Sequence, residues 1–117
     1  MTRDEVHALI MAMPGVEEGA SYGEPSYKVK GKFLTRLRSE DDSLVLMDIH
    51  FDEREMLMEA EPATFHITPH YQGYPSVLAK IAAIDARSLM DLLERRWRKI
   101  ASKALLKAYD AEKNRPA

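Results

Sequence analysis

The residues best suited to binding chemistry form a cationic run between residues 28 and 38. Lys and Arg are the side chains that contact the phosphates of nucleic acids. With Gly31 at its centre, the run predicts a hairpin with cationic strands. A structural role is the alternative, because Lys on an exposed sheet face or edge opposes aggregation. The run has five basic residues and no acidic one: Lys28, Lys30, Lys32, Arg36 and Arg38.

A second cationic segment lies between residues 95 and 107 and also lacks acids. On a helix, Arg95, Arg98 and Lys99 fall opposite an apolar stripe that includes Trp97. They would extend a nucleic-acid surface if both cationic segments faced the same way. Alternatively, they only complement the helix dipole near a C-terminus. Because there is no helix with base-reading side chains, we expect any binding to be largely independent of sequence.

The segment PHYQGYP, residues 69–75, is a loop by composition and carries the rival functional hypothesis. Loops often carry function, and tyrosines stack on bases or ligand rings. His70, Tyr71 and Tyr74 would then bind a small ligand or a protein partner, including a second copy of the chain. An uncovered sheet face would contribute to that site, with apolar residues on the same side as Arg36: Leu34, Leu44 and Leu46.

Enzymatic chemistry is not expected, and neither is a metal or another cofactor. The sequence has no cysteine, no phosphate loop and no zinc-protease helix. His50, His66 and His70 are an alternative metal-ligand set. Because Pro69 separates His66 from His70, these two cannot share a helix face, and we interpret the three as ordinary histidines.

Residues 40–61 hold nine acids and a single cation, Arg54. Asp52, Glu55 and Glu59 fall along one side of an expected helix. We interpret them as a solvated face whose first acids suit the helix dipole.

Length and composition indicate one domain over residues 1–117, with enough apolar residues for a core of its own. The N-terminus lacks the pattern of a signal peptide, and no apolar run is long enough to span a membrane. We therefore expect a cytoplasmic protein without a membrane partner.

Alternation of apolar and polar residues predicts strands over residues 26–30, 33–38 and 44–49. It places Phe33, Thr35 and Leu37 on one face of the second strand, and Val45 with Ile49 on one face of the third. Residues 16–21, 64–68 and 77–84 are further expected strands, and residues 22–25 an expected turn.

Helices are predicted where apolar residues recur at helical spacing behind a capping residue. Thr2 with Glu5 is a capping box for the first helix, and Asp52 is the expected cap of the second. Asp85 and Ser102 cap two further helices, with one bent helix over residues 85–112 as the alternative. Trp97 is expected between helix and sheet, and residues 114–117 are expected to fray.

Three pieces of the sequence resemble the MmcQ/YjbR family, and the resemblance covers nearly the whole chain. They are the segment Gly23–Phe33, the loop Thr68–Pro75, and the helix with Leu92, Leu93 and Trp97. Many members have proline at the position of Ser102, and serine also starts a helix well. The resemblance implies a frataxin/CyaY-like fold and a DNA-binding "double-wing" protein, and it brings no catalytic motif.

Together these features predict an α+β domain with a single antiparallel sheet and helices packed on one face. We expect weak, largely sequence-independent DNA binding through the basic strands and the basic end of the third helix. The alternative is a non-enzymatic interaction or small-ligand module that uses the PHYQGYP loop.

Overall fold

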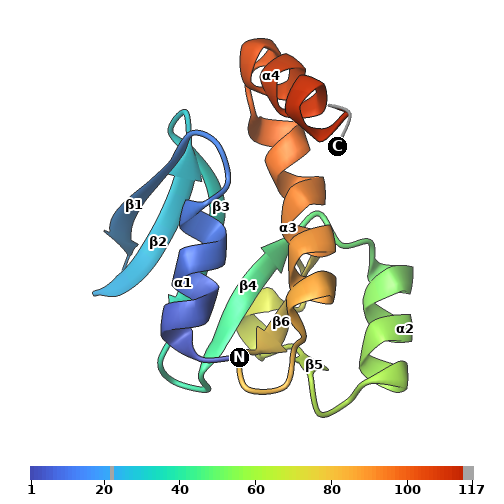
Figure 1. The fold of residues 1–117 in the computed structure, drawn as a ribbon. Coiled ribbons are helices and arrows are strands. Elements are labelled where there is room, and N and C mark those ends of the chain that lie inside the picture. Colours follow the sequence, from blue (N-terminus) through green and yellow to red (C-terminus); the bar gives the residue numbers. More distant parts are fainter. Residues whose placement is uncertain (22, 115–117) are drawn as a thin grey trace.

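The computed structural model describes residues 1–21 and 23–114. Tyr22, within the expected turn, and residues 115–117, at the expected frayed end, lie outside them. A six-stranded antiparallel sheet has the order β1-β2-β3-β4-β6-β5 (Figure 1). The expected α+β class with a single antiparallel sheet is confirmed. The strands are β1 (Val16–Ser21), β2 (Glu24–Val29), β3 (Lys32–Arg38), β4 (Ser43–Met47), β5 (Phe65–His66) and β6 (Ser76–Lys80).

Helices α1 (Arg3–Met11) and α3 (Ala86–Ile100) lie on the same side of the sheet (Figure 1). Helix α2 (Phe51–Ala60) packs beside β5 and β6, and α4 (Lys103–Lys113) follows α3 as a separate helix. The expected caps are present on α1, α3 and α4, because Thr2, Asp85 and Ser102 each accept a backbone N–H three residues on. Each cap joins residues three positions apart, so a short stretch of sequence is enough to predict it.

The core lies between the sheet and the helices and centres on Trp97. Trp97 is fully buried, and its Nε1 donates to the carbonyl oxygen of Pro14 over 2.8 Å. Leu34, Leu44 and Leu46 are buried in the same core. The expectation that these three leucines lie on an uncovered face beside Arg36 is therefore wrong.

A β-bulge explains why the faces differ from the simple alternation. In the β2–β3 pairing, Tyr27 lies opposite Thr35 but Lys28 lies opposite Phe33, so Leu34 is an extra residue. Leu34 and Leu37 consequently face the core, and Phe33 packs in a second cluster on the other face with Val45, Met47, Tyr71 and Leu78. We call this the rear face of the sheet. Similarly, Asp48 has a φ of +62°, and Ile49 joins the core instead of following Val45.

Several element boundaries also differ from the predictions; for example, β2 begins at Glu24, within the expected turn over residues 22–25. Helix α2 begins after His50, which makes no side-chain cap bond, instead of after Asp52. Strand β6 ends at Lys80, where the chain turns toward α3, so the predicted strand over 77–84 is too long. Strand β5 has two residues where five were expected, because its pairing with β6 covers only Phe65 and His66.

Candidate functional site

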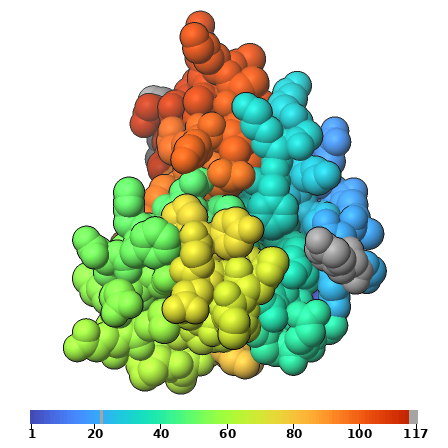
Figure 2. Space-filling model, turned by 180° about the vertical axis from the view of Figure 1, so that it is seen from behind, coloured from blue at the N-terminus to red at the C-terminus, as the bar shows by residue number. Residues whose placement is uncertain are grey.

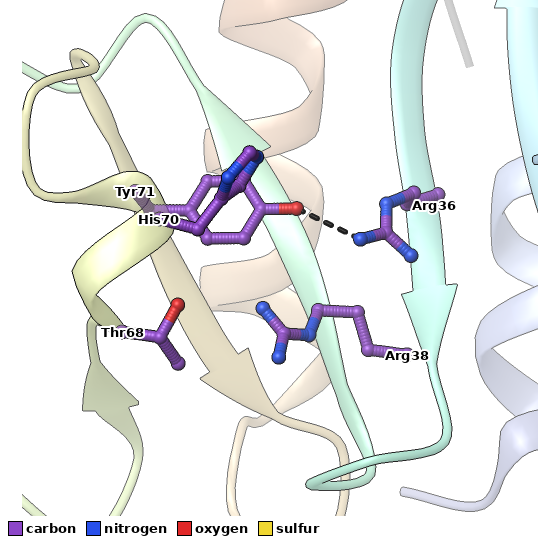
Figure 3. A pocket seen from close by; sticks show the side chains of 5 residues that line it. All are labelled: Arg36, Arg38, Thr68, His70 and Tyr71. Atoms are coloured by element: carbon purple, nitrogen blue, oxygen red, sulfur yellow. Dashed lines mark hydrogen bonds between the residues drawn. The ribbon is translucent and has the colours of Figure 1, made fainter. Parts of the chain in front are cut away.

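A hollow of about 380 Å³ lies on the rear face, between β3 and the loop after β5 (Figure 3). Its walls come from both parts of the sequence that were treated as rival sites. The basic strand supplies Arg36 and Arg38, and the segment at residues 68–71 supplies Thr68, His70 and Tyr71. The two sets of candidate residues therefore meet in one place.

Strand geometry brings the two arginines to this hollow. Arg36 and Arg38 are two residues apart in β3, so their side chains leave the same face of the sheet. The chain then returns through the short 3-10 helix η1 (Pro69–Tyr71), which carries Tyr71 over the second apolar cluster. Nη2 of Arg36 donates to the hydroxyl of Tyr71 over 3.0 Å (Figure 3).

Arg38 is the more enclosed of the two arginines, with 7% of its surface exposed. Its guanidinium carbon lies 5.3 Å from the centre of the Tyr71 ring, a cation–π distance. Its Nη2 pairs with Glu40 at 3.1 Å and its Nε lies 3.4 Å from Asp41. Nε is buried and has no hydrogen bond of good geometry within the described residues. Arg38 is thus fixed in place by charge and by packing.

Asp41 links Arg38 to a histidine behind it. An Oδ of Asp41 lies 2.8 Å from Nε2 of His66, and the hydroxyl of Ser43 donates to the other Oδ. Partial burial opposes ionisation of Asp41, but the hydrogen bonds from Ser43 and His66 and the charge of Arg38 outweigh it. The pKa of the Asp41 carboxyl is therefore lowered. Near neutral pH, Asp41 is therefore an anion, and its charge holds Arg38 in place.

Arg54 fixes the PHYQGYP loop and was missed by the sequence analysis. It is 6% exposed, and its guanidinium donates to four backbone carbonyl oxygens at 2.9–3.3 Å. The only signal in the sequence was a single cation among nine acids. Because carbonyl groups satisfy its donors, Arg54 determines the shape of the loop that carries His70 and Tyr71. The four carbonyls belong to Tyr71, Gln72, Tyr74 and Ser76.

His70 and Tyr74 form the exposed rim of this region. The centres of their rings are 6.0 Å apart with an angle of 37° between the planes, and Tyr74 is 53% exposed. His70 also meets Tyr71 edge to face at 4.8 Å. The loop therefore presents aromatic surface to the solvent beside the two arginines.

The three lysines of the β2–β3 hairpin are exposed. Lys30 and Gly31 both have positive φ, as a two-residue type I′ turn requires. Lys28 lies opposite Phe33 and so shares the rear face with the hollow. In residues 1–21 and 23–114, no acid lies within ion-pair distance of Lys28, Lys30 or Lys32.

The predicted cations of α3 are placed differently. Figure 2 shows the α3–α4 segment beside the β2–β3 hairpin at one end of the molecule, so the two cationic segments are neighbours. However, the α3 cations are engaged by acids: Arg95 by Glu53, Arg98 by Glu94 and Asp110, and Lys99 by Asp48 at 2.9 Å. None of them lines the hollow.

Two further features of the described part of the chain bear on function. No group of three or more His, Asp or Glu side chains there is arranged to hold a metal, so His50, His66 and His70 do not form such a set. His66 is instead bonded to Asp41. None of the helices there has the length and apolar character needed to cross a membrane.

Comparison with known proteins places the chain in a sequence family. The model of the YjbR family matches residues 11–99, which is 89 of 117 residues. Uncharacterized proteins of Mycobacterium bovis (Mb2600) and Mycobacterium tuberculosis (Rv2570) are each 29% identical over 122 aligned residues. The alignment covers 92% of this chain and 95% of each relative. No solved structure matches, so the frataxin/CyaY-like fold stays a prediction.

Proposed function

The chain belongs to the YjbR family, and we propose that it binds nucleic acid weakly and without base-sequence preference, as a binding domain and not as an enzyme. The observation that carries this proposal is the meeting of Arg36 and Arg38 with Tyr71 in one hollow on the rear face. Lys28, exposed on the same face, and Lys30, in the Gly31 turn, extend the cationic surface away from it.

Phosphate is the group that suits this arrangement. A guanidinium can donate two parallel hydrogen bonds to phosphate oxygens, and two neighbouring arginines in a shallow hollow offer such donors together. Arg36 is oriented by Tyr71, and Arg38 by its acidic neighbours and the Tyr71 ring. Because both side chains are ordered before a ligand arrives, less side-chain entropy is lost on binding.

Acidic side chains limit the affinity and set the direction of approach. Glu40 and Asp41 pair with Arg38 at one end of β3, and Glu17 lies opposite Lys28 in the β1–β2 register. A phosphate backbone is therefore repelled from the Glu40 end. We expect it to run from the hollow toward the Gly31 turn.

A salt titration tests this proposal. If Lys30, Lys32, Arg36 and Arg38 each contact a phosphate, log affinity for duplex DNA should fall against log salt with a slope of about −3 to −4. The dissociation constant should be on the order of 10⁻⁴ to 10⁻⁶ M at physiological salt. Changing Lys30 and Lys32 together to alanine should flatten the slope by about two without unfolding the domain. The matched control is Arg87→Ala, an exposed cation at the start of α3 that makes no ion pair within the described residues.

Absence of DNA binding would contradict the proposed function. Labelled DNA, single-stranded or duplex, that shows no binding at low salt with about 100 µM protein would exclude a non-specific site of the usual strength.

A small phosphorylated ligand is the second candidate, and the size of the hollow favours it. Its volume of about 380 Å³ lies within the usual range for small-molecule sites, about 300–1,000 Å³. On that hypothesis, affinity for a nucleoside monophosphate would equal or exceed that for an oligonucleotide and would depend on His70 and Tyr71 but not on Lys30. Isothermal titration with both ligands separates the two functions.

A further inference from the structure

We propose that the hollow on the rear face accepts an unpaired nucleotide, so that the protein prefers single-stranded nucleic acid to duplex. This inference rests on the proposed function and specifies its ligand. The phosphate would meet Arg36 and Arg38, and the base of the same nucleotide would stack on the ring of His70.

The first support is the kind of side chain at the rim. Aromatic rings beside cations are the usual means of holding single strands, because each unpaired base offers a flat face for stacking. In a duplex those faces are covered by the neighbouring base pairs. The exposed rings of His70 and Tyr74 would therefore contribute nothing to binding a duplex through its phosphates alone.

The second support is the spacing of the groups. His70 lines the same hollow as Arg36 and Arg38, so one nucleotide can reach both the cations and the ring. The His70 and Tyr74 rings, with centres 6.0 Å apart and planes inclined by 37°, are tilted relative to one another. Both residues are exposed, so a base can reach them from the solvent.

The third support is the rigidity of the loop that holds the rings. Arg54 is bonded to the carbonyl oxygens of Tyr71, Gln72 and Tyr74, which fixes the backbone on both sides of the rim. His70 is further held edge to face against Tyr71, whose hydroxyl is bonded to Arg36. A stacking surface that is already ordered loses little entropy when a base binds.

The experiment compares a labelled 20-nucleotide thymidine strand with a 20-base-pair duplex by fluorescence anisotropy at one low salt concentration. We expect the single strand to bind at least about tenfold more tightly, since stacking of one base on an aromatic ring has an effect of that order. His70→Ala combined with Tyr74→Ala should weaken single-strand binding about tenfold and change duplex binding less than about twofold. Melting curves confirm that each variant is folded.

Substitutions at His70 distinguish stacking from charge. His70→Phe keeps a flat ring and should retain the preference for the single strand, whereas His70→Lys supplies a cation without a ring and should lose it. The matched control is His50→Ala, an exposed histidine that lines a different hollow and should bind both ligands like the unchanged protein.

The other outcomes separate failure of the single-strand preference from failure of nucleic-acid binding itself. Equal affinity for both ligands, or an equal loss of both in the double variant, would overturn the single-strand inference and leave nucleic-acid binding intact. Failure of both ligands to bind would overturn the proposed function and this inference with it. Tight binding of thymidine monophosphate with no gain for the longer strand would assign the hollow to a free nucleotide.

Discussion

The hydroxyl of Tyr71 accepts a hydrogen bond from Nη2 of Arg36 over 3.0 Å, and the two residues are 35 positions apart in the chain. This bond joins the PHYQGYP loop to the basic strand. The ring of the same tyrosine lies beside the guanidinium of Arg38. Tyr71 therefore orients both arginines, one through its hydroxyl and one through its ring.

Tyr71→Phe separates these two roles. The variant keeps the ring beside Arg38 and removes only the bond to Arg36, so the free energy of unfolding should fall by about 0.5–1.5 kcal/mol. Nucleic-acid affinity should fall severalfold because Arg36 loses its hydrogen bond to Tyr71 at the hollow. Tyr109→Phe, which removes a bond to Glu94 on α3, is the matched control and should leave affinity unchanged. Unchanged binding by Tyr71→Phe would show that the orientation of Arg36 is unimportant.

Arg54→Met should loosen the PHYQGYP loop. The substitution keeps much of the side-chain volume but removes the four hydrogen bonds from the guanidinium to backbone carbonyl oxygens. A hydrogen bond to a charged group contributes about 1.5–3 kcal/mol. Urea denaturation should show a loss at least this large, and amide hydrogen exchange should accelerate near residues 71–76. Arg95→Met, which breaks a partly exposed pair with Glu53, should cost about 1 kcal/mol or less. Equal effects of the two substitutions would contradict the anchoring role of Arg54.

Trp97→Ala should lower the free energy of unfolding by about 3–5 kcal/mol, the usual cost of removing a large buried side chain. Trp97 is fully buried and its indole N–H satisfies the carbonyl oxygen of Pro14. The fluorescence maximum of the native protein should accordingly lie at a shorter wavelength than that of the unfolded chain. A native spectrum centred where exposed tryptophan emits would be incompatible with this packing.

Stability should decline in acid partly through Asp48. Partial burial opposes ionisation of this carboxyl, but hydrogen bonds from Lys99 and Arg96 outweigh it and lower its pKa in the folded protein. Its ionised form therefore stabilises the fold fully above the unfolded pKa of about 3.9. That stabilisation is lost as the pH falls through the lower folded pKa.

Asp48→Asn should therefore show a smaller decline than the unchanged protein when unfolding is measured from about pH 5 to pH 2. Part of the decline should persist, because the pKa of Asp41 is also lowered. Asp52→Asn, at an exposed position, is the control and should reproduce the original decline. Identical pH profiles for Asp48→Asn and the unchanged protein would mean that Asp48 contributes nothing.

The sequence predicted features that depend on neighbouring residues. The caps at Thr2, Asp85 and Ser102 and the hairpin turn at Gly31 each involve residues within a few positions of one another. The side-chain faces of β3 could not be predicted in the same way. The extra residue at Leu34 is defined only by the pairing of β3 with β2. It reverses which side chains of β3 face the core over part of the strand.

The candidate site was predicted in its parts but not as a whole. Arg36, Arg38, His70 and Tyr71 were all identified, yet only the folded chain brings them to one hollow. The involvement of Glu53 with Arg95 and of Asp48 with Lys99 also depends on contacts across more than 40 positions. Local charge runs do not contain that information.

The anchoring of the PHYQGYP loop makes it suitable for deliberate diversification. Arg54 bonds to main-chain oxygens, which every amino acid possesses, so the loop backbone does not depend on which side chains it carries at 72–74. A side chain added at Gly73 would meet open space. A library randomised at residues 70 and 72–74 would therefore retain one scaffold geometry while varying its rim. This small chain, which has no cysteine, could then be selected for binding to new targets.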